Sequence, residues 1–157
     1  MAGYGTDEAF QTWATDNGYT VPAGTVAAAR LRGSVYIDGA YGSRFPGRPT
    51  GGVDQEREWP RTGATDRYGN ALPSDEVPLR IEHAAYHAAL IELQTPGFFS
   101  KTYTASERKV LTEVKGIKWT VVGSAKGEMA EVPVSTTIAG MLAPLLLPEH
   151  APAILVV

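Results

Sequence analysis

Apolar residues recur every three or four positions in four stretches of the chain, which is the spacing that buries one face of an α-helix. The predicted helices run from Thr6 or Asp7 to Asn17-Gly18, from Pro22 to about Ala40, from between Ser74 and Pro78 to about Leu93, and from Ser135 to Leu146, where Pro144 is expected to shorten the last one. The first start has side chains that can cap a helix, and the next two have a proline, which a first turn tolerates.

Between Lys109 and Val122 the period of the apolar residues changes to two, which predicts a β-hairpin with its turn at Lys115-Gly116. A lone hairpin is marginal in water, so we expect it to pack on the helices or to pair with another chain. The predicted fold class is therefore mainly α: a small helical domain of about four helices with one β-hairpin and a long ordered loop. We expect residues 1–157 to form a single domain.

Residues 42–74 form a long segment without a sustained period, punctuated by proline and glycine. Its most informative stretch is Glu58-Trp59-Pro60-Arg61-Thr62-Gly63, because Pro60 biases Trp59 towards extended backbone and Gly63 permits a positive φ. Irregular loops of this length are usually functional or disordered, and the large aromatic and the built-in turns favour an ordered, functional one. Tryptophan and arginine are enriched at interface anchors, so we expect an inter-subunit loop that uses Trp59, Pro60, Arg61, Asp66 and Arg67. The alternative is that Trp59 covers the two principal helices of its own chain.

Composition narrows the class of protein. The chain has 157 residues, a formal net charge of −3 and a pI of about 5.6, so no global basic field draws it to nucleic acid. It has no cysteine, which excludes disulfides, thiolate metal sites and cysteine nucleophiles. The first residues lack the basic and apolar regions of a signal peptide, and no run of about eighteen apolar residues is present, so we expect no membrane partner.

Candidate catalytic chemistry is sparse. His83 and His87 stand at i and i+4 on the third predicted helix, a spacing that can place two imidazoles on one metal ion. The zinc-protease pattern requires a glutamate directly after the first histidine, where this chain has Ala84, and His150 in the proline-rich tail offers no convincing third ligand. No nucleophile elbow or phosphate-binding loop is present, and Asp38 is expected to make a structural hydrogen bond rather than to act as a base. We therefore expect no catalytic residues, no cofactor and no metal, with a small metal-dependent enzyme at His83 and His87 as a distant alternative.

Nucleic-acid binding is a further possibility that the long loop raises. Its arginines and aromatic residues are the mixture that a single-strand binder uses: Arg44, Arg48, Arg57, Arg61, Arg67, Trp59 and Tyr68. Four carboxylates are interleaved with the five arginines, which leaves the region at about +1, and phosphate affinity depends on net cationic contact: Asp54, Glu56, Glu58 and Asp66. The favoured interpretation is that these arginines pair with carboxylates within or between subunits, and we expect no preference for single-stranded over double-stranded DNA.

Two blocks of the sequence resemble a known family. They are Arg32-Gly33-Ser34-Val35-Tyr36-Ile37-Asp38-Gly39-Ala40-Tyr41, and the run Gln55, Trp59-Pro60-Arg61, Gly63, Asp66, Gly69, Leu72-Pro73, Val77-Pro78, Ile81 and Ala84. Both resemble motifs of the head–tail connector (adaptor, or head-completion) proteins of tailed phages, which are often labelled as DnaT-like single-stranded-DNA-binding proteins. The resemblance extends from about Thr6 to Leu147. Arg57 is a departure, because an apolar residue is expected there, so the packing of the loop is expected to differ around it.

The resemblance implies a structural virion protein without catalytic activity. A connector of this kind is a helical subunit of a homo-oligomeric ring, expected to be a dodecamer, in the neck of the virion between the portal protein and another neck or tail protein. Double-stranded DNA passes through its lumen during ejection without sequence readout. The expected localisation is the virion, after synthesis in the host cytoplasm. This viral-assembly role is the preferred interpretation, and a single-stranded-DNA-binding, DnaT-like accessory protein of replication is the alternative.

The last ten residues, 148–157, form an apolar tail that the resemblance does not explain. Pro148 and Pro152 stop any helix, so the end of the tail should be extended, and its β-branched residues favour a strand. Left free, it would expose large apolar side chains, which gives it a reason to dock. We expect another chain, such as the portal, to receive Ile154, Leu155, Val156 and Val157. Docking on the helices or the hairpin of its own chain is the alternative.

Overall fold

The computed structural model of the chain describes residues 2–100 and 135–148. Within them it contains four α-helices and one pair of short strands: α1 (Asp7–Asp16), α2 (Val26–Tyr41), β1 (Arg48–Pro49), β2 (Arg61–Thr62), α3 (Leu79–Gln94) and α4 (Thr136–Leu142). Short 3₁₀ turns are also present: η1 (Gly42–Arg44), η2 (Gly52–Asp54) and η4 (Ala143–Leu145). The predicted fold class is confirmed, because the described part is mainly α with four helices, a two-stranded hairpin and a long ordered loop.

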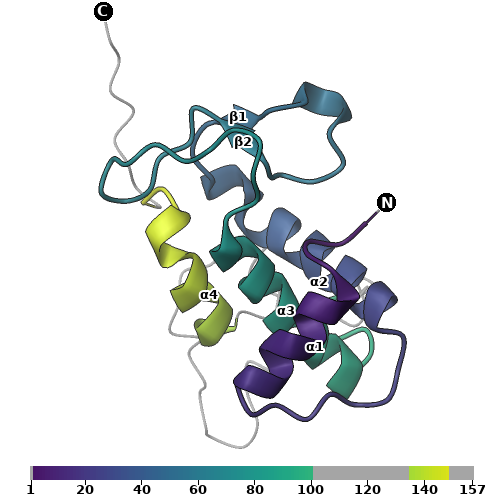
Figure 1. Cartoon of the computed structure of the whole chain (residues 1–157). Helices are drawn as coiled ribbons and strands as arrows, with labels where there is room; N and C mark the ends of the chain where they lie inside the picture. Colours follow the sequence, from purple (N-terminus) through teal and green to yellow (C-terminus); the bar gives the residue numbers. More distant parts are fainter. Residues whose placement is uncertain (1, 101–134, 149–157) are drawn as a thin grey trace, which may run out of the picture.

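Helix α3 is the centre of the fold, with α1 and α2 packed against it on one side and α4 on the other (Figure 1). Small residues allow the closest of these contacts. A Cβ added to Gly33 of α2 would lie 2.8 Å from the backbone oxygen of Ala85 in α3, a separation that real Cβ atoms essentially never show. The long loop with β1 and β2 lies beyond one end of the helices, at the top of Figure 1.

Two clusters of buried side chains hold these elements together. One joins α2, α3 and α4 to the long loop, and its members include Ile37, Ile81, Leu142 and Trp59. The other joins α1 to α3 through aromatic rings, since the centroids of Phe10 and Tyr86 lie 5.8 Å apart at an interplanar angle of 74°. Burying a large apolar side chain stabilises a fold by about 1.5–3 kcal/mol, so the loop residue in the first cluster is part of the core rather than an appendage.

The helix starts follow the sequence prediction at α1 and differ from it at α2. At α1 the hydroxyl of Thr6 accepts a hydrogen bond from the backbone N–H of Ala9 at 3.1 Å, as a capping side chain does. The prediction that Pro22 opens the second helix is wrong, because α2 begins only at Val26. Gly24 has a φ of +157°, which no helix can contain, so the chain bends after Pro22 before the helix can start.

At α3 and α4 the prolines mark a helix start and a helix end close to the predicted positions. Pro78 immediately precedes α3, and its fixed φ of −59° suits a helix start. Pro144 ends the last helix as expected, because α4 stops at Leu142 and the chain continues as the 3₁₀ turn η4. The hydroxyl of Ser135 caps α4 by accepting a hydrogen bond from the N–H of Ile138 at 3.4 Å.

The observed hairpin is not the predicted one. Strands β1 and β2 pair antiparallel inside the long loop, with Arg48 opposite Thr62 and Pro49 opposite Arg61. Strands of two residues are too short to show an alternating pattern, so the sequence carried no trace of them. The hairpin predicted over Lys109–Val122 lies outside the described residues, as do positions 149–157 of the tail. The single domain over 1–157 stays a prediction.

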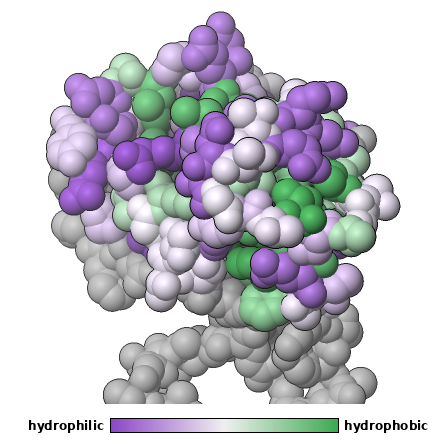
Figure 2. Space-filling view, turned by 60° about the horizontal axis from the view of Figure 1, so that its bottom comes forward, coloured by the Kyte–Doolittle hydropathy of each residue, from purple (hydrophilic) through white to green (hydrophobic). Residues whose placement is uncertain are grey.

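The surface of the described part mixes polar and apolar residues. Seen from the side that lies at the bottom of Figure 1, hydrophilic residues surround several small apolar patches (Figure 2). The large apolar side chains that are most exposed come from separate elements, namely Val35 of α2, Val53 of η2, Tyr68 of the long loop and Leu79 of α3. No helix among the described residues is both long and apolar enough to cross a bilayer.

Candidate functional site

Trp59 anchors the first half of the long loop in the core. Its side chain is 1% exposed, and its ring meets that of Phe45 edge-on, with centroids 5.6 Å apart. Its backbone N–H donates to the hydroxyl of Tyr4 at 3.2 Å, which ties the loop to the N-terminal segment. Trp59 thus packs on helices of its own chain, which is the intrachain role given as the alternative in the sequence analysis. A contact of the loop with a second subunit stays a prediction.

Arg61 is a clamp for the same part of the loop. Its side chain is 5% exposed, with Nε donating to the carbonyl of Pro46 at 2.8 Å and Nη2 to that of Gly47 at 2.9 Å. Its Nη1 donates to the carboxylate of Glu58 in an ion pair. Pro60 lies between the two buried residues, after a cis peptide bond, and its carbonyl accepts from the N–H of Thr50 at 3.1 Å. The guanidinium of Arg61 is therefore fully occupied inside the chain.

Arg57 stands where an apolar residue is expected, and its contacts explain the difference. Its Nη1 donates to Oδ2 of Asp38 at 3.1 Å, while the hydroxyl of Tyr4 donates to Oδ1 of the same carboxylate at 2.6 Å. Burial raises the pKa of Asp38, and the Tyr4 hydrogen bond and the Arg57 charge offset only part of that rise. A carboxylate that is largely removed from water requires such partners, so Arg57 and Asp38 form a structural pair that connects the loop to α2.

The second half of the loop contains a tight turn over residues 65–71. Thr65 and Ala71 face each other as an antiparallel bridge, and Gly69 adopts a φ of +86° between them. Oδ1 of Asp66 accepts from the backbone N–H groups of Tyr68 and Asn70 at 2.8 and 2.9 Å, and its Oδ2 accepts from Nδ2 of Asn70 at 2.8 Å. The Asn70 side chain and these backbone donors lower the pKa of Asp66. The carboxylate is therefore charged and directed into its own turn.

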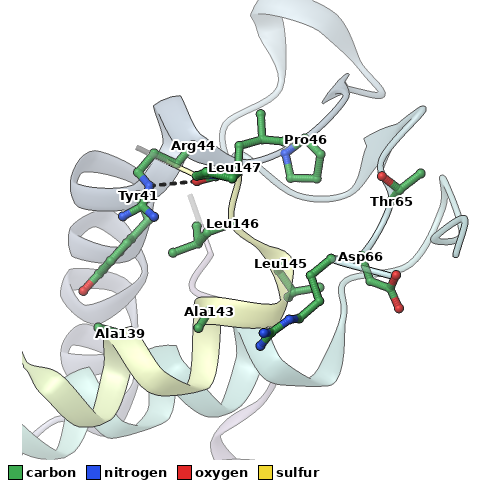
Figure 3. A pocket seen from close by; sticks show the side chains of 12 residues that line it. Tyr41, Arg44, Pro46, Thr65, Asp66, Ala139, Ala143, Leu145, Leu146 and Leu147 are labelled. Atoms are coloured by element: carbon green, nitrogen blue, oxygen red, sulfur yellow. Dashed lines mark hydrogen bonds between the residues drawn. The ribbon is translucent and has the colours of Figure 1, made fainter. Parts of the chain in front are cut away.

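A groove of about 570 Å³ opens between this turn, the end of α2 and the α4–η4 segment (Figure 3). Its apolar lining comes from Pro46, from α4, from η4 and from the residues that follow η4, and its polar side chains come from the end of α2, from η1 and from the turn. The lining residues are Tyr41, Arg44, Pro46, Thr65, Asp66, Arg67, Ala139, Ala143, Leu145, Leu146, Leu147 and Pro148. Two backbone hydrogen bonds of 2.8 Å fix the walls, one from the N–H of Arg67 to Pro144 and one from the N–H of Leu147 to Arg44. The groove is thus built by segments that lie far apart in the sequence.

Two arginines line this groove from different segments. Arg44 belongs to η1, and its Nε donates to the carbonyl of Leu147 at 3.2 Å, as the dashed line in Figure 3 marks. Arg67 comes from the turn, and its guanidinium carbon lies 5.4 Å from the centroid of the Tyr68 ring, within the range of a cation–π contact. Tyr68 is not itself a lining residue, but its ring lies beside one of them.

The arginines of the described part differ in their carboxylate partners. Four of them have carboxylate partners within 4.0 Å: Arg30 with Asp7, Arg32 with Glu92, Arg57 with Asp38 and Arg61 with Glu58. Arg48 of β1 and Arg67 are exposed, and neither forms an ion pair with a described residue. The ion-paired arginines are occupied within the chain, so the sequence, which shows all loop arginines alike, does not reveal this difference.

The two helix histidines pack as aromatic rings. His83 and His87 of α3 both contact Trp13 of α1, with ring centroids 6.2 Å apart in each case, and His87 also contacts Tyr19 at 5.9 Å. Burial lowers the pKa of His87, so the ring is neutral at pH 7. Among the described residues, no group of three or more histidine, cysteine, aspartate or glutamate side chains could hold a metal ion. His150 lies outside that part of the chain.

The chain matches a family model along nearly its whole length. Residues 3–156 match the family described as "Putative DnaT-like ssDNA binding protein". The chain therefore belongs to this family. The chain itself has no match among the curated proteins or the solved structures.

This finding corrects the preferred interpretation of the sequence. No head–tail connector family matches the chain, so its identification as a structural connector subunit of the virion is wrong, and the alternative that names single-stranded DNA is the better supported one. The twelvefold ring, the portal contact and the neck partner rested on the connector resemblance and lose their support with it. Of the partners expected, the family description is compatible with DNA alone.

Proposed function

We propose that this protein binds single-stranded DNA without catalysing a reaction on it, as an accessory protein of replication. Its family membership supports a DNA partner. The observation that carries the proposal is the groove lined by Arg44 and Arg67, with the exposed ring of Tyr68 next to the Arg67 guanidinium. Non-specific binders of single strands combine a cationic groove, which follows the phosphates, with aromatic rings on which bases stack. A protein with this role would act in the cytoplasm, where the DNA is copied.

The net charge of −3 does not oppose such binding as strongly as the sequence suggested. Each carboxylate that is paired inside the chain also occupies an arginine, as Glu58 does with Arg61 and Asp38 does with Arg57, so the charges that matter are the local ones at the groove. Asp66, which lines the groove, directs both oxygens into hydrogen bonds of its own turn. Since phosphate affinity depends on local cationic contacts, the rim of the groove can attract a strand although the whole chain is acidic.

The apolar lining of the groove suits the sugar and the base of a nucleotide. Ala139 of α4 and Ala143, the first residue of η4, are four positions apart, which is about one helical turn, and Leu145 and Leu146 at the end of η4 continue this lining. Sugars and base faces are largely apolar, so a strand whose phosphates meet the arginines could lay these parts against the lining. Only an unpaired strand exposes its base faces for such a contact.

Binding of a labelled oligothymidylate, measured by fluorescence anisotropy over a range of salt concentrations, tests the proposal. The oligonucleotide should have roughly 20 nucleotides, longer than the ~4–16 nucleotides that one OB-fold domain covers. We expect a Kd that weakens with salt, and a double variant Arg44→Ala/Arg67→Ala that binds more weakly. Because each phosphate contact on a single strand contributes about 0.7 to the slope of log K against log salt, the slope of the double variant should fall by about 1.4.

Arg80→Ala is the matched control. Arg80 is exposed like Arg67, but it lies at the start of α3 and donates to the carbonyl of Met141 at 3.4 Å. Met141 is two residues from both Ala139 and Ala143, so it lies on the opposite side of α4 from the groove. Loss of Arg80 should leave both the affinity and the salt slope unchanged. Absence of oligonucleotide binding by the unaltered protein at low salt, or an equal loss in the control, would refute the proposal.

A further inference from the structure

Tyr68 is the most exposed aromatic side chain of the described residues. It is 77% exposed, although tyrosine is a residue that folding usually buries at least in part. It does not lie on a loose segment, because its own backbone N–H is held by Oδ1 of Asp66 at 2.8 Å, inside the turn that Thr65 and Ala71 close. The chain thus holds a large ring in water on a fixed backbone, and packing within the described part does not explain it.

We propose that Tyr68 is the stacking platform of the DNA site: its ring binds the face of one unpaired base while Arg67 binds the neighbouring phosphate. This inference rests on the proposed function and assigns the roles within it. The guanidinium of Arg67 lies 5.4 Å from the centroid of the ring, so the cation and the platform are already side by side. A base and the phosphate next to it belong to one nucleotide, so a ring and a cation that lie side by side can contact the two parts of the same unit.

The turn gives this pair a fixed orientation before any ligand binds. Three hydrogen bonds converge on the carboxylate of Asp66, and a fourth joins the N–H of Gly69 to the carbonyl of Asp66 at 3.0 Å. Arg67 is also tied to the far wall of the groove through its backbone N–H, which donates to Pro144. Ordering on binding costs affinity, so a platform that is held in place in advance loses less of it.

Arg67 and Tyr68 contact different parts of the strand and so contribute differently to recognition. Arg67 meets a phosphate, which single and double strands both carry, so it contributes affinity without distinguishing them. Tyr68 needs a free base face, which a duplex does not offer except at its ends. The preference for single strands therefore resides in Tyr68, whereas the salt dependence resides in Arg44 and Arg67.

Three ligands of equal length separate these roles: oligothymidylate, its duplex with oligoadenylate, and an abasic deoxyribose-phosphate strand that has phosphates but no bases. The variants are Tyr68→Leu, which keeps an apolar side chain without a π face, and Tyr68→Phe, which keeps the ring. We expect Tyr68→Leu to weaken oligothymidylate binding about tenfold, as loss of one base–aromatic stack does, and Tyr68→Phe to keep it. Both variants should bind the abasic strand and the duplex as the unaltered protein does. Both should also fold normally, because the side chain is exposed.

The outcomes distinguish the two proposals. If the unaltered protein binds none of the three ligands, the proposed function and the role of Tyr68 both fail. If it binds oligothymidylate but Tyr68→Leu binds it equally well, the function stands and the stacking role is overturned. Equal affinity of the unaltered protein for the abasic strand and for oligothymidylate would overturn the stacking role in the same way. A Tyr68→Trp variant adds a direct reading, because stacking should quench the indole fluorescence on oligothymidylate but not on the abasic strand.

Discussion

The long loop contains two pairs of an arginine and an aromatic residue, and they lie in opposite environments. Trp59 and Arg61 are 1% and 5% exposed, and they hold the first half of the loop to the helices. Tyr68 is 77% exposed, and Arg67 beside it is exposed as well. The first pair has the residue types of protein-interface anchors, yet both side chains are buried within their own chain. The second pair is less conspicuous in the sequence, yet it is the one that faces solvent.

The difference lies in the acceptors that each arginine finds. Arg61 is surrounded by the carbonyls of residues 45–47 and by the carboxylate of Glu58. Arg67 has an acidic neighbour too, but Asp66 uses its oxygens on the N–H groups of its own turn. The net charge of a segment therefore does not show which of its arginines can bind a ligand. Glu58 neutralises Arg61, whereas Asp66 holds the backbone of the turn that carries Arg67.

The largest expected effect is on stability, from Trp59→Ala. Truncating a buried aromatic side chain costs about 3–5 kcal/mol, and Trp59 belongs to the cluster that joins the loop to α2, α3 and α4. Urea unfolding should show this loss in the free energy of unfolding. The matched control, Tyr68→Ala, should change it by less than about 0.5 kcal/mol, as exposed substitutions do. A stable Trp59→Ala protein that fails to bind DNA would reverse the assignment of the two pairs.

The second effect concerns the two arginines, compared by the same replacement. Arg61→Lys keeps the charge but loses the planar fork that reaches several carbonyls at once, so we expect a loss of about 2–3 kcal/mol in the free energy of unfolding. Arg67→Lys should be neutral for stability, within about 0.5 kcal/mol, because its guanidinium contacts only an exposed ring. Chemical denaturation of both variants measures the contrast. Equal losses in the two would contradict the view that only Arg61 is a clamp.

The helices were predictable because their information is local. The apolar spacing of α3 and the capping side chain of Thr6 act within a few residues, and they place helices at nearly the observed bounds. The error at Pro22 has a conformational cause, since a proline that suits a first turn also suits the extended bend that Gly24 completes. The strands β1 and β2 are too short to have a period, and only the packing of the loop pairs them.

The candidate site was predictable in its residue types but not in their roles. The mixture of arginines and aromatics in the loop raised single-strand binding as an alternative. The separation of Arg61 from Arg67 depends on contacts with residues 45–47, which no local pattern reveals. The groove itself needs α4, which lies about seventy residues further along the chain than the turn it faces. One signal was available: Glu58 stands three residues before Arg61, a spacing at which the two side chains can meet.

The third effect is smaller and depends on pH. Arg57→Leu restores the apolar residue expected at that position but leaves Asp38 without its counter-charge, which should cost about 2 kcal/mol near pH 7. Burial already raises the folded-state pKa of Asp38, and loss of Arg57 should raise it further. A raised carboxyl pKa means that ionisation costs stability as the pH rises through it, so the deficit of the variant should shrink as the pH falls below that pKa.

A second substitution checks the cause of this deficit. In Asp38→Asn/Arg57→Leu the partly buried carboxylate is replaced by a neutral amide, so most of the lost stability at pH 7 should return, and the pH dependence should disappear. Thermal unfolding followed between about pH 4 and pH 7, the range above the ordinary aspartate pKa, measures both changes. A deficit that stays constant across this range would show that Arg57 acts through packing rather than through Asp38.

The smallest effect should come from the turn that presents Tyr68, and it should appear in binding rather than in global stability. Asp66→Ala and Asp66→Asn both remove the negative charge from the groove, but only asparagine keeps an oxygen that can accept from the N–H groups of Tyr68 and Asn70. The two variants should have nearly the same melting temperature, since the turn is exposed. Asp66→Asn should bind oligothymidylate at least as tightly as the unaltered protein, whereas Asp66→Ala should bind about threefold to tenfold more weakly than Asp66→Asn, because the turn must then be ordered on binding. Faster amide hydrogen exchange at Tyr68 and Asn70 in the alanine variant would confirm the loss of order. Equal affinities of the two variants, despite that loss, would mean that the groove arginines alone hold the strand and that the fixed orientation of Tyr68 contributes nothing.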